Sequence, residues 1–573
     1  MTNQPNATDL YNAWLNDPNV DEETKAELRG IADQPSEIED RFYRDLEFGT
    51  GGLRGVMGAG TNRMNRYVVG KATQGFARYL LERFSSPTSS PSVVIAHDSR
   101  NHSDSFALEA ACVLAANGIK TYLFRSLRPT PQLSFAVRDL KASGGIVITA
   151  SHNPPEYNGY KVYGPDGGQL VPADAERVIA SIRKVASFDE VKRLSPEEAE
   201  ARGLIVWLGE DADERYTDAV VSQSVQPDAI RNGAGKELKI VYTPLHGAGN
   251  LPVRRVLEKA GFTNVHIVPE QERPDGFFPT VKSPNPEERE AFTLAIELAE
   301  KIGADIIIGT DPDSDRMGAV VKNKEGRFEV LTGNQSGAIM AYYLLSNLKK
   351  LGKLPGDGAV IKTIVTSEMG ADIAKSFGMS VFNTLTGFKY IGEKITEFER
   401  TGKHTFLFGY EESYGYLTGT YARDKDAVVA ALLICEAAAY YKSQGKTLYD
   451  VLLELYAEYG TYLEQLESRT LKGKDGVEKI AGIMNDWRTN PPSSVAGAAV
   501  SQVLDYKNGL DGLPKENVLK FLLADGSWFC LRPSGTEPKI KVYFAVRGNG
   551  LGEAEAALKR LVAAVMERVD ALS

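Results

Sequence analysis

Residues 144–154 read GGIVITASHNP, a short apolar run that leads directly into a cluster of polar residues. The run 144–148 is short, β-branched and bounded by Gly and Pro, which favours a strand buried on both faces over a helical segment. Ser151 then lies just beyond the carboxyl end of that strand, where open α/β sheets bind their ligands. A polar turn that only satisfies its own backbone amides is the alternative at this point.

The same order of strand, helix, strand, helix, strand and polar cluster occurs three times along the chain. The copies span residues 92–154, 238–316 and 359–415, and their polar clusters read TASHNP, DPDSDR and GYEESYG. Strands that alternate with helices pair in parallel through right-handed crossovers, so each copy predicts a small doubly wound α/β domain. Three domains that present polar strand ends can converge on one central cleft.

The two ends of the chain follow other patterns. From about residue 465, segments with alternating apolar and polar positions predict an antiparallel sheet, and a helix at 552–572 is expected to cover it. The first forty residues predict two short helices outside the first domain. The expected fold class is α/β, with three consecutive doubly wound domains of mixed or parallel sheets and a C-terminal α+β domain. The expected domain boundaries are 1–205, 206–330, 331–460 and 461–573.

Composition describes a multidomain protein without a general affinity for polyanions. A chain of 573 residues is too long for one core, and about 150 residues per domain suggests about four domains. The hydrophobic share of 42% and the charged share of 25% are those of ordinary globular proteins. The formal net charge of −10 argues against nucleic acid as a partner, although a local basic pocket can still receive phosphate.

Cysteine usage and the apolar segments indicate a cytoplasmic protein. Cys112, Cys435 and Cys530 lie far apart, without the spacing of a disulfide framework or a zinc site. The first residues lack a basic region followed by an apolar core, so we expect no signal peptide. The longest apolar helical stretch, 427–441, carries Glu436 and is too short to cross a membrane, which predicts a core helix.

Three aspartates alternate in the second polar cluster. Asp311, Asp313 and Asp315 repel one another if they converge, by about 4 kcal/mol per pair at about 4 Å for an effective dielectric near 20. A hard divalent cation removes that repulsion, and three carboxylate ligands suit Mg²⁺ in a phosphoryl-transfer site. An EF-hand is excluded because Arg316 and Lys322 occupy the positions of its Gly and its last Glu. A solvated acidic turn stays open as the alternative.

The stretch RPSGTEPK, which begins at Arg532, combines the residues of a phosphate cradle. Gly535 permits a tight turn, Ser534 and Thr536 add hydroxyls, and the arginine adds a bidentate fork. A polar hairpin turn is the alternative. Nucleotide binding is not indicated, because the chain has no P-loop motif and GTGGLRG places Arg54 where a dinucleotide-binding motif needs its last glycine.

The other polar residues carry less information individually. Glu411 and Ser413 are two positions apart and share a side if the segment is extended, which suits adjacent sugar hydroxyls. Lys161 and Lys389 follow glycine turns and are single lysines. No G-x-S-x-G motif surrounds Ser151, so a hydrolase triad is not supported. A better partner for a nucleophilic serine is a phosphoryl group held by the cation at the aspartates.

Taken together and in order, FGTGGLRG, TASHNP, NGYK, GTDPDSDR, TGFK, GYEES and RPSGTEPK resemble the motifs of the α-D-phosphohexomutase family. This family comprises the phosphoglucomutases and phosphomannomutases, and the resemblance covers the chain from about residue 45 to its carboxyl end. With its amino-terminal extension, the chain is most similar to the bacterial phosphoglucomutase branch. The resemblance implies four domains around one cleft.

The resemblance also implies roles for individual positions. It places the phosphoryl-carrying serine at Ser151, and it implies a Mg²⁺ site made by that residue together with Asp311, Asp313 and Asp315. It assigns the sugar hydroxyls to Glu411 and Ser413. It assigns the clamp on the non-reacting phosphate to Arg532, Ser534, Gly535 and Thr536. Residues that orient phosphate or assist proton transfer are expected at Arg54, Lys161, Arg316 and Lys389, and His152 is expected to hold the serine loop.

The implied reaction interconverts glucose 1-phosphate and glucose 6-phosphate through a phosphoserine and glucose 1,6-bisphosphate, which also serves as activator. Phosphorylated sugars are the expected ligands, and no nucleic acid, membrane or obligate protein partner is expected. A phosphomannomutase, a phosphopentomutase, a glucose 1,6-bisphosphate synthase and a noncatalytic sugar-phosphate sensor are the alternatives. Tyr410 and Lys541 stand where many relatives have glycine and arginine, which leaves the preferred sugar open.

Overall fold

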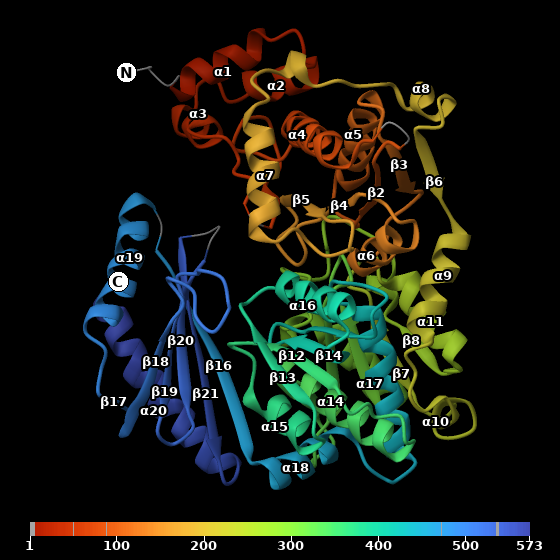
Figure 1. The fold of residues 1–573 in the computed structure, drawn as a ribbon, viewed down its shortest axis with the longest axis vertical. Coiled ribbons are helices and arrows are strands. Elements are labelled where there is room, and N and C mark those ends of the chain that lie inside the picture. Colours follow the sequence, from red (N-terminus) through yellow and green to blue (C-terminus); the bar gives the residue numbers. More distant parts are fainter. Residues whose placement is uncertain (1–5, 50, 87–88, 472, 535–537) are drawn as a thin grey trace.

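A computed structural model describes residues 6–49, 51–86, 89–471, 473–534 and 538–573. The chain forms four domains, each built on one sheet (Figure 1). The predicted fold class is confirmed, with three consecutive α/β domains followed by a domain whose sheet is antiparallel throughout. Within the described part of the chain, no helix combines the length and the apolar character that crossing a bilayer requires.

The first domain contains a six-stranded mixed sheet in the order β1-β5-β4-β2-β3-β6. Its strands are β1 (Leu53–Val56), β2 (Ser92–His97), β3 (Lys120–Phe124), β4 (Gly144–Ile148), β5 (Tyr157–Tyr163) and β6 (Ile205–Leu208). Its helices are α4 (Arg66–Phe84), α5 (Ser103–Ala116), α6 (Thr130–Asp139), α7 (Pro172–Arg183) and α8 (Pro196–Ala201). Strand β6 pairs with β3, so the first sheet extends to Leu208, past the predicted boundary at 205.

Three helices, rather than the two expected, precede the first sheet. They are α1 (Ala7–Asn16), α2 (Glu22–Arg29) and α3 (Pro35–Phe42). The extra boundary arises at Pro35, which occupies the first turn of α3, where a proline is tolerated because its missing N–H has no intrahelical partner. The three helices share a small core with α4, in which Trp14 packs against Phe42 and Tyr67.

The second and third domains repeat the strand order of the first. The second contains α9 (Glu210–Val221), α10 (Pro227–Arg231), β7 (Ile240–Thr243), α11 (Asn250–Ala260), β8 (Val265–Ile267), α12 (Pro269–Glu272), α13 (Thr293–Ile302), β9 (Ile306–Thr310), β10 (Met317–Lys322) and β11 (Phe328–Val330). The third contains α14 (Gly333–Lys350), β12 (Gly358–Thr363), α15 (Glu368–Ser376), β13 (Ser380–Thr384), α16 (Phe388–Thr401), β14 (Thr405–Glu411), β15 (Gly415–Thr418), α17 (Ala427–Lys442) and α18 (Leu448–Tyr459).

In each of the three units, the first parallel strand lies between the second and the third, and an antiparallel strand follows the third. These rows are β3-β2-β4-β5, β8-β7-β9-β10 and β13-β12-β14-β15. Each polar motif found in the sequence is the turn between the third strand and its antiparallel neighbour. Each turn also contains a non-glycine residue with positive φ, namely Ser151, Ser314 and Tyr414. The threefold repetition predicted from sequence is therefore present in the strand topology.

The fourth domain is a six-stranded antiparallel sheet in the order β16-β21-β20-β19-β18-β17. Its strands are β16 (Thr461–Thr470), β17 (Ser494–Val495), β18 (Ala498–Asp505), β19 (Leu519–Leu523), β20 (Trp528–Pro533) and β21 (Lys539–Gly548). Its helices are α19 (Gly473–Thr489) and α20 (Leu551–Ala571), and the buried side chains of both belong to the core on one face of the sheet. This domain lies beside the third domain in Figure 1.

Helix α17 is the predicted core helix, and it belongs to a core that the second and third domains share. It packs against α11 and α10 of the second domain and against α14 and α18 of the third. Glu436 on this helix is fully buried, yet its carboxylate accepts hydrogen bonds from the backbone N–H groups of Val225 and Gln226 and from the hydroxyls of Ser224 and Tyr343. Burial of this charged group is therefore matched by four donors.

We expect Glu436→Ala to destabilise the shared core, because it leaves two half-buried backbone N–H groups and two hydroxyls without this acceptor. The expected loss in unfolding free energy is about 3 kcal/mol. Glu436→Gln keeps one acceptor oxygen and should lose less. Calorimetric melting of both variants beside the natural protein tests this, and an unchanged melting temperature for Glu436→Ala would contradict it.

Candidate functional site

The polar turns of the first two domains meet. Ser151 lies in the turn between β4 and β5, and Asp311 follows β9 directly. The Ser151 hydroxyl donates a hydrogen bond to Asp311 Oδ2 at 3.0 Å, and both side chains are buried. The parallel strands of two separate sheets thus direct their carboxyl ends at one point, which is where sequence reasoning placed the chemistry.

The serine turn is held in an unfavourable backbone conformation. Ser151 has a φ of 53°, in the left-handed region that non-glycine residues seldom occupy. Its N–H donates to Thr149 Oγ1 at 2.9 Å, which fixes the turn from inside. Conformations of this kind persist only where the surroundings determine them.

Arg100 supplies most of the external support for that turn. Its guanidinium donates to the carbonyl oxygens of Ser151 at 2.6 Å, Asn153 at 2.5 Å, Pro154 at 2.9 Å and Tyr157 at 3.1 Å. The side chain is completely buried, and its Nε lies 3.3 Å from Asp98 Oδ2. Sequence reasoning missed Arg100, although the polar stretch HDSR after β2 was a signal, because β2 and β4 are parallel neighbours and end at the same edge.

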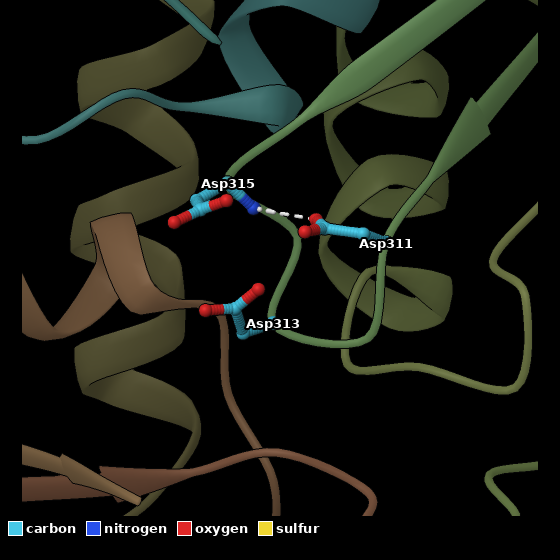
Figure 2. A group of neighbouring side chains, drawn as sticks. All are labelled: Asp311, Asp313 and Asp315. Atoms are coloured by element: carbon cyan, nitrogen blue, oxygen red, sulfur yellow. Dashed lines mark hydrogen bonds between the residues drawn. The ribbon is translucent and has the colours of Figure 1, made fainter. Parts of the chain in front are cut away.

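Figure 2 shows the three aspartates near one another on the turn between β9 and β10. Their ligand oxygens lie within 4.8 Å of one another, and all three residues are buried. Asp311 Oδ1 accepts from the backbone N–H groups of Asp315 and Arg316, both at 3.1 Å. Asp313 Oδ1 and Asp315 Oδ1 are buried, and neither has a hydrogen-bond partner among the described residues. Oxygens of this kind fit a hard cation, so the triad is suited to hold Mg²⁺.

The pKa values of two of these carboxylates are shifted in opposite directions. Burial and the adjacent charges of Asp313 and Asp315 raise the pKa of Asp311 well above its ordinary value. Burial also acts against ionisation of Asp315, but the ammonium groups of Lys425 and Lys161 outweigh it and lower that pKa. The triad therefore concentrates negative charge that needs compensation.

The compensating cations come from two other domains. Lys161 on β5 has its Nζ 3.1 Å from Asp313 Oδ2 and 3.7 Å from Asp315 Oδ2. Lys425, in the segment before α17, lies 2.9 Å from Asp315 Oδ2. Thr130 at the start of α6 donates its hydroxyl to Asp313 at 2.9 Å. Sequence reasoning named Lys161 but missed Lys425 and Thr130, because neither belongs to one of the polar clusters that follow the third strand of a unit.

Three further predicted residues surround the serine and the aspartates. Arg54 on β1 donates to Asn153 Oδ1 in the serine turn at 3.2 Å. The Nδ1 atom of His152 lies 3.3 Å from Ser151 Oγ, and burial together with the nearby positive charge of Arg316 lowers the pKa of His152. The Arg316 guanidinium donates to Glu287 at 2.6 Å, and its Nε lies 4.0 Å from Asp315.

The third turn differs in one respect from the expectation. Glu411 ends β14, is buried, and accepts the N–H of Gly387 at 2.7 Å. Ser413 lies inside the turn between β14 and β15, so the extended segment that would place both side chains on one side does not form. The chain turns there with a φ of 65° at Tyr414, which is incompatible with a continuing strand.

Tyr410 faces away from the polar residue that follows it. Its ring packs on α14 and α15 at Gly337 and Gly370, where any Cβ atom would overlap the tyrosine. The residue is completely buried. Tyr410 therefore packs against the helices of its own domain, and two glycines make the space for it.

The structure describes two of the four residues of the predicted phosphate clamp, Arg532 and Ser534. Arg532 is the next-to-last residue of β20 and donates through Nε to Glu516 Oε1 at 2.9 Å. Ser534 donates its N–H to the carbonyl of Lys539 at 2.7 Å. Gly535 and Thr536 lie outside the described residues.

Other cations gather near Arg532. Lys541 is its cross-strand partner on β21, and burial together with the charges of Arg532 and Arg316 lowers the pKa of Lys541. Burial also lowers the pKa of Lys389, which is influenced by Glu516 and Arg532.

Family profiles match all four domains. They are phosphoglucomutase/phosphomannomutase alpha/beta/alpha domain I at residues 45–188, domain II at 214–326, domain III at 332–459, and the C-terminal domain at 469–567. Each matched range contains most of one of the four sheets.

Similar proteins were found among both curated sequences and solved structures. A phosphoglucomutase of Staphylococcus haemolyticus is 39% identical over 519 residues, which cover 89% of this chain and 91% of that protein. A phosphoglucomutase of Staphylococcus aureus is 37% identical and covers 91% and 93%. A putative phosphomannomutase from Thermus thermophilus has a TM-score of 0.68 at 23% identity, covering 92% and 99%. The open form of parafusin from Paramecium has a TM-score of 0.71 at 19% identity, covering 92% and 95%; both structures show a shared fold.

We expect Mg²⁺ to raise the melting temperature progressively as its concentration exceeds its Kd, because a cation that binds only the folded protein stabilises it. Asp313→Asn should lose most of this increase, since it removes one carboxylate of the triad. Asp211→Asn, which removes an equal charge from an exposed position on α9, should keep it. Melting curves over a Mg²⁺ titration measure the effect, and equal shifts in both variants would argue against a cation at the triad.

Proposed function

The chain belongs to the phosphoglucomutase/phosphomannomutase family, and from this premise we propose that it is a Mg²⁺-dependent phosphoglucomutase that interconverts glucose 1-phosphate and glucose 6-phosphate. The observation that carries the proposal is the 3.0 Å contact between the Ser151 hydroxyl and Asp311 in a buried triad with unpartnered oxygens. A hydroxyl beside a cation site is the arrangement that phosphoryl transfer needs.

In the proposed reaction, Ser151 carries a phosphoryl group that passes to the free hydroxyl of the bound sugar phosphate. The bond between Ser151 Oγ and phosphorus breaks, a bond from phosphorus to the sugar oxygen forms, and the sugar hydroxyl gives up its proton. Mg²⁺ held by Asp311, Asp313 and Asp315 would neutralise charge on the phosphoryl oxygens. We assign acceptance of that proton to the amine of Lys161, which lies beside the triad, and the in-line hold on the phosphoryl group to Arg54, which contacts the serine turn.

The second half of the cycle reverses these roles. Glucose 1,6-bisphosphate turns end for end, its other phosphoryl group returns to Ser151, and the second sugar phosphate leaves. Glu411 and Ser413 serve the sugar hydroxyls, and the non-reacting phosphate is held by Arg532, Ser534, Gly535 and Thr536. Both orientations of the intermediate need only one serine and metal centre and one distant clamp, which is consistent with cations grouped separately at Arg532 and Lys541.

A coupled assay for glucose 6-phosphate tests the proposal directly. With glucose 1-phosphate, Mg²⁺ and the bisphosphate activator, the natural protein should turn over. Ser151→Ala should lose at least about a thousandfold in kcat, because the group that carries phosphate is removed. Intact mass should show one added phosphate in the natural protein and none in Ser151→Ala. Absence of glucose 6-phosphate formation by the natural protein would refute the proposal.

The preferred sugar is tested by comparing kcat/KM for glucose, mannose and pentose 1-phosphates under identical conditions. Glucose 1-phosphate should rank first, as expected from the curated relatives at 37–39% identity. A higher value for mannose or pentose phosphate would assign the chain to one of those alternatives. Net accumulation of glucose 1,6-bisphosphate would indicate a synthase. Sugar-phosphate binding without turnover of any substrate would indicate a sensor.

A further inference from the structure

A loop of the second domain packs against the serine turn of the first domain and its supporting residues. This segment, residues 273–285, connects α12 to the region before α13 and is called the brace loop below. It touches the first domain at three places. Gly276 abuts Asn101, so that a Cβ atom there would collide with the Asn101 backbone nitrogen. The ring of Phe278 covers the guanidinium of Arg100 at 5.1 Å, and Ser283 donates its hydroxyl to the carbonyl of His152 at 3.1 Å.

Phe278 is held in place by burial and by hydrogen bonds within the brace loop. It is 1% exposed and has a φ of 48°, a conformation that a bulky side chain rarely adopts. Its N–H donates to the carbonyl of Asp275, and the N–H of Asp275 donates to the carbonyl of His246. The ring Nε2 of His246 lies 2.8 Å from Thr280 Oγ1. The loop is therefore anchored within the second domain, and only its outer side reaches the first.

The ring of Phe278 contacts a part of the Arg100 guanidinium that its hydrogen bonds to the serine turn leave unused. The N–H groups of a guanidinium point outward in one plane, and here they serve four carbonyls of the serine turn. The flat face carries no donor and attracts the ring of Phe278 through a cation–π interaction. Arg100 is thus fixed in its plane by the first domain and across its face by the second.

From these contacts we infer that the brace loop positions Ser151 for phosphoryl transfer, with Phe278 and Ser283 as positioning residues. The inference rests on the function proposed above. Ser151 belongs to the first domain and the aspartates to the second, so the in-line geometry depends on how the two domains are registered. A misplacement of about 1 Å at such a centre costs roughly 100-fold in rate. The brace loop lies in the same domain as the aspartates and holds the serine turn in register with them.

The test compares Phe278→Leu with the same substitution at the neighbouring residue, Phe277→Leu. Phe278→Leu keeps an apolar side chain but removes the ring face from Arg100. Phe277→Leu makes the same chemical change at the next residue, which is 70% exposed. We expect Phe278→Leu to lower kcat at least about tenfold while KM for glucose 1-phosphate stays within about twofold, because the distant clamp is untouched. Phe277→Leu should leave both constants unchanged.

Ser283→Ala and Ser283→Thr form a second pair, because only threonine can still donate a hydroxyl to His152. Alanine should lower kcat and threonine should restore most of it. The rate at which glucose 1,6-bisphosphate phosphorylates Ser151, followed by intact mass, should fall with kcat in the impaired variants. Activities are expressed per folded molecule from the melting curve of each variant.

Hydrogen exchange provides a readout that does not depend on activity. Amides of residues 149–157 should exchange faster in Phe278→Leu than in Phe277→Leu. If the natural protein proved inactive as a mutase, the proposed function would fail, and this exchange difference would still decide whether the brace exists. Phe278→Leu that melts earlier but keeps kcat and normal exchange at the serine turn would overturn the inference. Equal losses in Phe277→Leu and Phe278→Leu would overturn it as well.

Discussion

Three carboxylates buried at one sheet edge impose the constraint on which the other domains depend. Asp311, Asp313 and Asp315 lie where little water can screen them, and like charges at this range repel strongly. Part of the compensation comes from backbone N–H groups of their own turn. The remainder comes from outside, through Lys161 of the first domain and Lys425 of the third. Placing this charge therefore requires three domains to be assembled together.

The domains differ in how firmly they are joined. The second and third share one core around α17, so the aspartate turn and the turn after β14 sit on a single platform. The fourth domain has a core of its own and meets the third through a smaller apolar cluster that includes Ile364 and Trp528. Small interfaces between domains permit relative motion more readily than shared cores do. Arg532 thus lies on the part that is best able to move relative to the aspartate triad.

The pattern of apolar runs followed by polar residues predicted the fold and the turns that meet at Ser151 and the aspartates. The residues that this pattern did not identify were missed for physical reasons. The strands before Ser151, Asp311 and Glu411 are short apolar runs, which form buried parallel strands wherever they pack, so their polar ends were readable. Arg100 and Lys425 were missed because their roles depend on where a strand neighbour or another domain places them. Such positions follow from tertiary contacts that a single sequence does not specify, and the same holds for the pairing of β6 with β3.

The two ends of the proposed bisphosphate intermediate would meet chemically unlike sites. One is an acidic triad that needs a cation, and the other is a group of cations around Arg532. Because the intermediate must exchange its ends, each phosphate has to leave each site, and a clamp of unopposed cations would hold it too strongly. Glu516 accepts a hydrogen bond from Arg532 and lies near Lys389, so one carboxylate moderates two of these cations. In the proposed cycle, Glu516 would thus ease the release of phosphate from the clamp, and one metal held by the triad and one serine would serve both orientations.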